Sequence, residues 1–385
     1  MNVRDLLIVL VRYAIKGGAL DKSAIEQSLN SQAATLFKVA KCHDVAHLVC
    51  HALEKNGISV DGAVWKAFTA EKEQACLRYQ MIQADFEEIC TCLDECGVDY
   101  VPLKGAVVRS VYPEPWMRTS CDIDVLVREA DLDRAVDALV KKRGYKTDFK
   151  KTYHDVSLLS PFGMHLELHY NIKENEPKYD EILTQVWGLL QDAQGHKRLQ
   201  TKEFLLFHLT AHAAYHFARG GCGLRSVLDL HLLSADSYDK DKLNTLLEKA
   251  RLVRFYNEII SLGEYWFGIK ENVSQTVLEA EKYILLGGAY GTAQQGAVAG
   301  QIKKGGKFKY FWSRIFMPYE SLAVLYPVIK KHKILTPFCQ VRRWFGALFK
   351  SKRIAKEIKN VTASDREQVE KTKKLLSDLG LCREA

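Results

Sequence analysis

Apolar residues recur three and four positions apart along the first part of the chain, from Leu6 to Ala14 and again over residues 34–52. This spacing places them on one face of a helix and predicts an N-terminal helical region over residues 1–96. The last element of this region is expected to be a long helix over residues 61–96, with Gly97 as its stop signal.

The pattern changes after Gly97, where short runs of β-branched and aromatic residues alternate with helical stretches. The runs predict five strands, over residues 98–103, 122–127, 145–150, 155–160 and 165–170. Helices are predicted over residues 105–112 and 131–142. Strands and helices mixed over so short a stretch predict a compact α+β unit over residues 97–178.

Helical spacing returns from residue 179, and the strongest amphipathic helices are predicted over residues 204–218 and 224–233. The fold class is therefore expected to be α+β, with a small mixed-sheet core embedded between mainly α-helical flanking regions. The predicted units are a helical region 1–96, the α+β core 97–178, a helical domain 179–300 and a basic, aromatic-rich helical region 301–385.

The composition is that of an ordinary globular protein, with 47% hydrophobic and 26% charged residues. No apolar run reaches the roughly 20 residues of a membrane-spanning helix. Arg12 interrupts the first apolar run and no small-residue cleavage site follows, so a secretory signal is not expected. The expected location is the cytoplasm.

The ten cysteines contain no Cys-x-x-Cys pair. Cys90, Cys92 and Cys96 cluster within a predicted helix, where residues two apart point in different directions. Free thiols in a reducing compartment are the preferred interpretation, and a structural zinc site is the weaker alternative.

The net charge of +8 is concentrated in one segment. Residues 301–360 contain fifteen Lys or Arg and two acidic residues, with aromatic residues interleaved. Such a segment suits single-stranded nucleic acid or an anionic membrane surface. The favoured interpretation is more ordinary: a helical unit with a solvated basic face and an aromatic core.

The strongest chemical signal is the sequence Asp122-Ile123-Asp124 at the start of a predicted strand. Two residues apart on a strand, the carboxylates share one face and lie about 7 Å apart at roughly 3.3 Å of rise per residue. Their repulsion is relieved by solvent or by a shared cation, and Mg²⁺ prefers such oxygen ligands. A solvated strand edge is the alternative for an isolated pair.

A third carboxylate, Glu167, lies on a later predicted strand, where it shares a face with His165 and His169. If this strand lies beside Asp122–Val127, the three acids form one cluster. A zinc site made of His165, Glu167 and His169 is the alternative, but residues two apart on a flat strand rarely converge on one ion. The carboxylates favour magnesium.

Lys104-Gly105 lies at a predicted strand-to-helix turn, where backbone N–H groups can contact phosphate. Lys104 adds a positive charge, and Arg118 is near enough in sequence to the acids to reach a triphosphate. As single residues, a surface lysine and a plain turn are the simpler interpretations. Their order along the chain favours a functional role.

Taken together, these motifs resemble the nucleotidyltransferase superfamily of DNA polymerase beta. More narrowly, the sequence is similar to a largely uncharacterised bacterial nucleotidyltransferase family. The matching residues are Leu103-Lys104-Gly105, Tyr112-Pro113, Arg118, Asp122-Ile123-Asp124, Glu167-Leu168-His169-Tyr170, the histidines His208, His212 and His216, and Leu224, Arg225 and Asp229. The resemblance covers residues 98–233.

The resemblance implies metal-dependent transfer of a nucleoside monophosphate from a nucleoside triphosphate such as ATP to an unidentified small molecule, protein or RNA. Asp122 and Asp124 would hold Mg²⁺ or Mn²⁺, and Glu167 would hold a second ion or act as general base. Lys104 and Gly105, with Arg118 and Ser120 secondarily, would contact the triphosphate. A non-catalytic nucleotide- or RNA-binding protein on the same fold is the alternative, although the complete set of acids argues against it.

Two features complete the prediction. The superfamily often has a serine after its glycine turn, whereas Ala106 stands here and has no hydroxyl, which weakens the case for triphosphate binding. The resemblance also hints that His212, Arg225 and Asp229 line the cleft. The simpler interpretations are a packed histidine stripe and an ion pair between Arg225 and Asp229, four residues apart on one helix.

Overall fold

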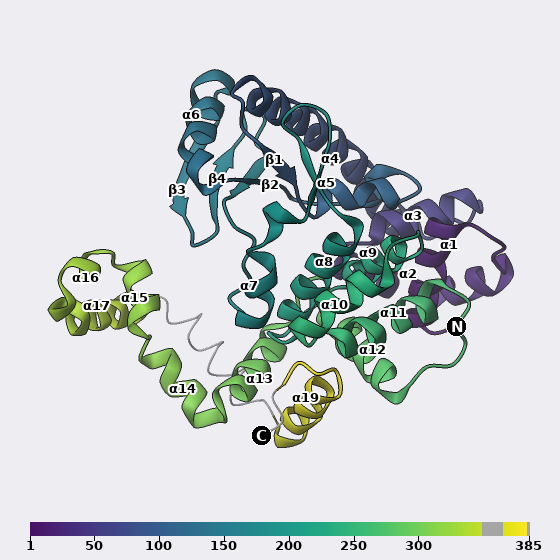
Figure 1. Cartoon of the computed structure of the whole chain (residues 1–385). Helices are drawn as coiled ribbons and strands as arrows, with labels where there is room; N and C mark the ends of the chain where they lie inside the picture. Colours follow the sequence, from purple (N-terminus) through teal and green to yellow (C-terminus); the bar gives the residue numbers. More distant parts are fainter. Residues whose placement is uncertain (349–364, 383–385) are drawn as a thin grey trace.

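The structure is a computed structural model that describes residues 1–348 and 365–382, with a small mixed sheet placed on a larger helical body (Figure 1). Four helices open the chain: α1 (Val3–Lys16), α2 (Lys22–Cys42), α3 (Ala46–Lys55) and α4 (Gly62–Glu95). The long helix predicted over residues 61–96 is thus confirmed as α4. Gly97 follows with a φ of 62°, a left-handed conformation that glycine adopts without strain.

Five strands form the sheet: β1 (Tyr100–Pro102), β2 (Asp122–Val127), β3 (Lys146–Lys151), β4 (Asp155–Leu159) and β5 (His165–His169). Their order is β1-β2-β5-β4-β3, with β2 and β5 parallel and the other neighbours antiparallel. The α+β class and the mixed sheet are therefore confirmed. The parallel pairing brings the start of β2 beside β5, although about 40 residues separate them in sequence.

One face of the sheet is apolar and packs against α4 and α6 (Leu132–Arg143), which lie over it in Figure 1. The strand residues of this face include Ile123, Val125, Val127, Leu166 and Leu168. Because side chains alternate along a strand, Asp124 and Glu167 point to the opposite face. The chain between β1 and β2 forms a turn. It contains α5 (Gly105–Val108) and short 3-10 segments over Arg109–Val111 and Pro115–Met117.

The helical body comes mainly from the second half of the chain. It contains α7 (Pro177–Leu183), α8 (Lys202–Phe217), α9 (Leu224–Ser234), α10 (Lys240–Ala250), α11 (Val253–Phe267), α12 (Gln275–Gly287), α13 (Ala293–Lys304) and α19 (Arg366–Asp378). A hairpin that the helical pattern did not predict, β6 (Leu190–Asp192) with β7 (Arg198–Gln200), lies between α7 and α8.

One hydrophobic core joins the first three helices to this body. It runs from Leu6 and Leu10 on α1 to Phe207 on α8 and Phe255 on α11. Residues from the predicted units 1–96 and 179–300 therefore share buried contacts. The division of the chain at these boundaries stays a prediction.

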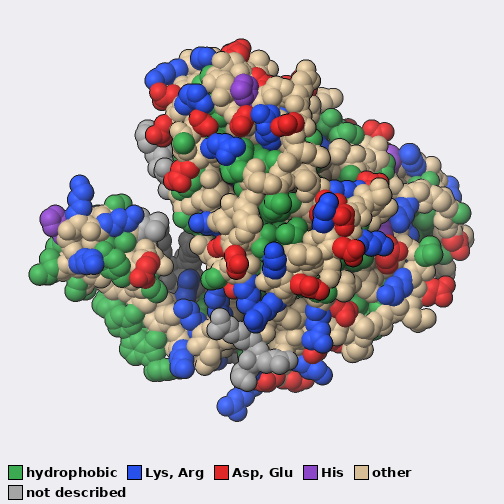
Figure 2. Space-filling view, in the orientation of Figure 1, with side chains coloured by type: hydrophobic (Ala, Val, Ile, Leu, Met, Phe, Trp, Pro, Cys, Tyr) green, Lys and Arg blue, Asp and Glu red, His purple; other side chains and the backbone are tan. Residues whose placement is uncertain are grey.

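The helices that follow α13 extend away from the body (Figure 1). They are α14 (Lys307–Ile315), α15 (Tyr319–Leu325), α16 (Val328–Lys331) and α17 (Thr336–Leu348). Figure 2 shows hydrophobic side chains gathered on this unit, and Phe308 and Phe338 are each 71% exposed. These two aromatic residues are not the core residues that the favoured sequence interpretation expected.

The structure describes only part of this C-terminal region. Residues 349–360 of the predicted basic segment lie outside the described residues. Within the described ranges, no helix has both the length and the apolar character that crossing a membrane requires.

Candidate active site

The predicted acids meet on the polar face of the sheet. In the parallel register of β2 and β5, Asp124 lies opposite Glu167. Potential ligand atoms of Asp124, Glu167 and His169 all lie within 4.8 Å of one another, which is close enough for a shared metal ion. The structure therefore brings together two of the three predicted acids, with a histidine beside them.

Asp124 is the most constrained of these groups, since it is 5% exposed and has two charged or polar partners. Its Oδ1 lies 3.0 Å from the Nζ of Lys104 and 2.9 Å from the Nε2 of His169. Burial alone would raise the pKa of Asp124, but Lys104 and His169 hold that pKa well below the usual range. Asp124 is therefore ionised over the whole physiological range.

Asp122 lies at the edge of this group, and its side chain is half-buried. It is outside the set of atoms within 4.8 Å, but it interacts electrostatically with Asp124 and Glu167. Burial raises the pKa of Asp122, and the two neighbouring carboxylates raise it further. The positively charged side chains of the site thus do not fully compensate its carboxylates.

Lys104 reaches Asp124 from an unusual backbone conformation, with a φ of 41° and a ψ of −115°. A non-glycine residue in this region costs about 1–3 kcal/mol and persists where its surroundings impose it. The neighbouring backbone supplies one constraint, because the N–H of Leu103 donates to the carbonyl of Asp124 over 3.0 Å. The strained turn therefore aims the lysine at the acids.

Gly105 follows Lys104 and permits a close approach of the segment before β2. A Cβ atom at Gly105 would lie 3.4 Å from the Cβ of Ser120 and 3.5 Å from the Nη1 of Arg118. The Ser120 hydroxyl is buried and accepts a hydrogen bond from Arg109. Three of the predicted phosphate-contacting residues are thus neighbours in space.

The expected ion pair between Arg225 and Asp229 is wrong. Asp229 instead accepts hydrogen bonds from the Nε and Nη2 of Arg118 and, over 2.6 Å, from the hydroxyl of Tyr112. Arg225 pairs with Asp44 and also donates to the carbonyl of Thr119. Contacts with residues distant in sequence thus replace the ion pair expected within the helix. The contacts with Tyr112, Arg118 and Thr119 join α9 to the segment that leads into β2.

A pocket of about 130 Å³ lies next to these contacts. Its polar lining includes Lys104, Arg118, His212, Arg225 and Asp229. The residues that the resemblance placed in the cleft therefore line one pocket with two of the predicted phosphate-contacting residues. Three cationic side chains line this pocket, each of them paired with a carboxylate: Lys104 with Asp124, Arg118 with Asp229 and Arg225 with Asp44.

A second pocket, of about 230 Å³, is lined by Lys104, His154, His169, Glu174 and His212, among others. The Nδ1 of His212 lies 2.6 Å from the Oε1 of Glu174. Burial raises the pKa of Glu174, but the contact with His212 outweighs it and brings the pKa to about 2. The histidine stripe of α8 therefore faces the same space as Lys104 and His169, the two residues that contact Asp124.

The three histidines of α8 have different surroundings. His208 is 1% exposed and contacts Gln200, and burial lowers its pKa to about 3. Burial also lowers the pKa of His216, to about 4. His212 and His216 line both pockets, and His212 is the one paired with Glu174.

Sequence reasoning missed several groups at this site. His169 was considered in a zinc alternative and as part of the family motif, without a role toward Asp124, whereas its parallel strand places it against that residue. Glu174, in the segment after β5, His154, just before β4, and Asp155, the first residue of β4, carried no local signal.

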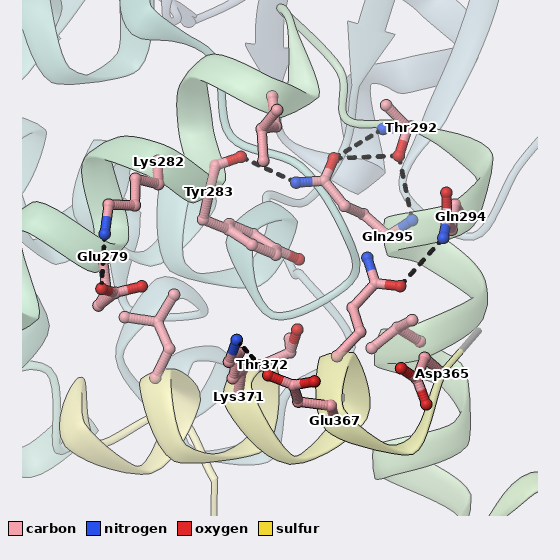
Figure 3. A pocket seen from close by; sticks show the side chains of 14 residues that line it. Glu279, Lys282, Tyr283, Thr292, Gln294, Gln295, Asp365, Glu367, Lys371 and Thr372 are labelled. Carbon is pink, nitrogen blue, oxygen red and sulfur yellow. Dashed lines mark hydrogen bonds and ion pairs between the residues drawn. The ribbon is translucent and has the colours of Figure 1, made fainter.

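A larger pocket, of about 510 Å³, lies between α12, α13 and α19 (Figure 3). Its polar side chains pair with one another, as in the contacts of Lys282 with Glu279 and of Gln294 with Gln368. None of the predicted site residues lines it. Size alone therefore does not identify the candidate active site.

A family model described as "Uncharacterised nucleotidyltransferase" matches residues 30–268, a range that includes the sheet, α8 and α9. No curated protein and no solved structure matches the chain.

Proposed function

The chain belongs to this uncharacterised nucleotidyltransferase family, and on that basis we propose that it transfers a nucleoside monophosphate from a nucleoside triphosphate to an acceptor. The observation that carries the proposal is the adjacency of Asp124 and Glu167 on parallel strands, with Asp122 on the same face of β2. Paired carboxylates of this kind hold divalent ions in phosphoryl-transfer sites.

Asp122, Asp124 and Glu167 fit Mg²⁺ or Mn²⁺ because they offer hard oxygen ligands on one face of the sheet. The raised pKa of Asp122 fits the same assignment, since burial and the neighbouring carboxylates both disfavour its negative charge and a bound cation would favour it. A bound divalent ion would neutralise phosphate charge and stabilise the leaving pyrophosphate. Glu167 would hold a second ion or accept the proton of the acceptor hydroxyl.

Lys104 has two tasks in this proposal. Without a metal ion, its ammonium compensates Asp124 over 3.0 Å. A cation held by the carboxylates would supply the positive charge beside Asp124, which would leave Lys104 available to the triphosphate. The pocket beside it would accommodate the phosphates, with the guanidinium groups of Arg118 and Arg225 at its wall. Gly105, which has no side chain, would allow the triphosphate to approach the backbone closely.

Arg118 and Ser120 are held by contacts within the protein, so their contribution to phosphate binding is secondary in this account. Arg118 donates to Asp229 and to the carbonyl of Thr119, and Ser120 accepts from Arg109. We assign them chiefly to fixing the turn that presents Lys104. The acceptor would enter the pocket walled by His212 and Glu174.

The test is incubation of the full chain with Mg²⁺, a fractionated lysate and nucleoside triphosphates labelled at either the α- or the γ-phosphate. Nucleotidyl transfer moves the α-label to an acceptor and leaves the γ-label in pyrophosphate. Transfer of the γ-label instead would replace the proposal with a kinase-type reaction. Binding of the triphosphate without any transfer would favour the non-catalytic alternative.

A further inference from the structure

One nitrogen at the edge of the candidate active site has no partner. His169 is 3% exposed, and its Nδ1 is buried without a hydrogen bond among the described residues. Its other nitrogen, Nε2, lies 2.9 Å from the carboxylate of Asp124. A carboxylate accepts, so Nε2 bears a proton, and in the neutral ring that metal ligation requires, Nδ1 has the unshared electron pair.

A second histidine and a carboxylate lie beside this nitrogen. Asp155, at the start of β4, pairs with His169 across the strands, and the ring of His154 stacks on that of His169 with centroids 5.4 Å apart. One potential ligand atom from each of the three residues lies within 4.8 Å of those of the other two. Because the Nε2 of His169 faces Asp124, Nδ1 is the nitrogen left for this group.

Thr152 fixes the orientation of the other two members. Its hydroxyl donates to the Oδ1 of Asp155 over 2.5 Å, and its oxygen accepts from the backbone N–H groups of His154 and Asp155 over 3.2 and 3.1 Å. The Nε2 of His154 lies 3.4 Å from the Oδ2 of Asp155. The imidazole and the carboxylate are thus held side by side, at a separation that one ion bound to both can bridge.

We propose that His154, Asp155 and His169 form a second metal site, for a divalent transition ion such as Zn²⁺. Two imidazoles and one carboxylate suit Zn²⁺, whereas Mg²⁺ prefers oxygen ligands. A carboxylate that accepts from the second nitrogen of a ligating histidine is a usual feature of zinc sites, and Asp124 has that role here. The site is distinct from the oxygen-rich centre of Asp122, Asp124 and Glu167.

The location of the site limits what it binds besides the metal. Three protein ligands leave a fourth position open, as in catalytic rather than structural zinc sites. His154 and His169 both line the pocket that Glu174 and His212 face from the other side. The open position is therefore available to water or to an oxygen of a molecule in that pocket. The proposal concerns metal binding and holds whether or not nucleotidyl transfer is found.

The test uses the full chain, stripped of metal with a chelator, and titration with Co²⁺ as a spectroscopic substitute for Zn²⁺. One equivalent of Co²⁺ with the intense visible absorption of a four-coordinate site containing nitrogen ligands is expected, and Zn²⁺ should displace it. His154→Gln should weaken binding at least ~10-fold, the size of effect typical even for second-shell changes. His154 is partly exposed, so this variant is not expected to unfold the protein.

Two further variants separate this site from its surroundings. Asp122→Asn alters the oxygen-rich centre and should leave Co²⁺ binding unchanged. His196→Gln removes a histidine that pairs with Asp99 outside the pocket, and should also have no effect. Absence of Co²⁺ binding by the wild-type chain, equal binding by His154→Gln, or a loss in Asp122→Asn as large as that in His154→Gln would each overturn the proposal. Thermal melting of every variant would show whether it is folded.

Discussion

Asp124 on β2 lies directly across from Glu167 on β5 in a parallel register. Strands in this relationship place two carboxylates side by side on a partly buried face, where their repulsion opposes folding. Lys104 and His169 offset part of this cost through contacts of 3.0 and 2.9 Å with Asp124. Asp122 makes no direct contact of this kind with a described residue, and the charges of Lys104 and Arg118 offset its unfavourable surroundings only in part. This difference leads to measurable consequences.

Asp122→Asn should stabilise the protein in the absence of metal while it removes activity. Burial and the carboxylates of Asp124 and Glu167 raise the pKa of Asp122 in the folded state above its value in the unfolded chain. Below the unfolded-state pKa of about 3.9, Asp122 is protonated in both states and contributes no penalty. As the pH rises through the raised folded-state pKa, the penalty develops in full.

The measurement is urea unfolding of both proteins in a chelating buffer from pH 4 to pH 8. The advantage of Asp122→Asn should be small at the acidic end and larger at neutral pH, and saturating Mg²⁺ should reverse it. Asp137→Asn, on the exposed side of α6, is the matched control and should change stability by less than about 0.5 kcal/mol. An Asp122→Asn variant less stable than wild type at pH 8 would show that the site carries no excess negative charge.

Lys104→Met should destabilise the metal-free protein, because Asp124 loses its cationic partner while it remains buried. Removing one partner of a buried ion pair costs about 3–5 kcal/mol of stability. Because Lys104 is partly exposed, the expected loss lies near the lower of these figures. Mg²⁺ should restore part of the loss, since it can replace the ammonium beside Asp124. Thermal melting with and without Mg²⁺ measures both effects, and an unchanged Tm in the variant would refute the compensating role of Lys104.

Asp229→Asn should also be destabilising, although Asp229 lies outside the proposed metal centre. Its carboxylate accepts from Arg118 and Tyr112 in a buried cluster, so the variant leaves a buried guanidinium without its counter-charge at a cost of about 3 kcal/mol. Lys141→Met, which breaks the exposed pair with Asp137, is the control and should cost at most about 0.5 kcal/mol. Equal costs in the two variants would mean that the Arg118–Asp229 contact is as weak as a surface pair.

Much of the sheet and the acids could be predicted from the sequence because the relevant signals are local. The alternation around Asp122–Val127 and His165–His169 fixes which side chains share a face, whichever strands are neighbours. The adjacency of Asp124 and Glu167 needed one further assumption, that these strands pair, and the structure supports it. The exposure of the aromatic residues of α14 and α17 was harder to predict, because burial depends on what packs against a helix.

The partners of individual charges could not be predicted because they join distant segments. Arg225 and Asp229 have the spacing of a helical ion pair, but each finds a better-placed partner, in Asp44 and Arg118 respectively. The contact between Glu174 and His212 likewise depends on how α8 packs under the sheet. Periodicity contains no information about such contacts.

The central claim is that the carboxylates of Asp124 and Glu167 carry out metal-dependent nucleotidyl transfer. Its most direct test is the rate of Mg²⁺-dependent transfer of α-phosphate label by the wild-type chain, Asp124→Asn, Glu167→Gln and the control Asp137→Asn. Loss of several kcal/mol of charge stabilisation predicts a fall of about 10³-fold or more in the first two variants, and no change in the control. Label transfer by Asp124→Asn at the wild-type rate would contradict the account.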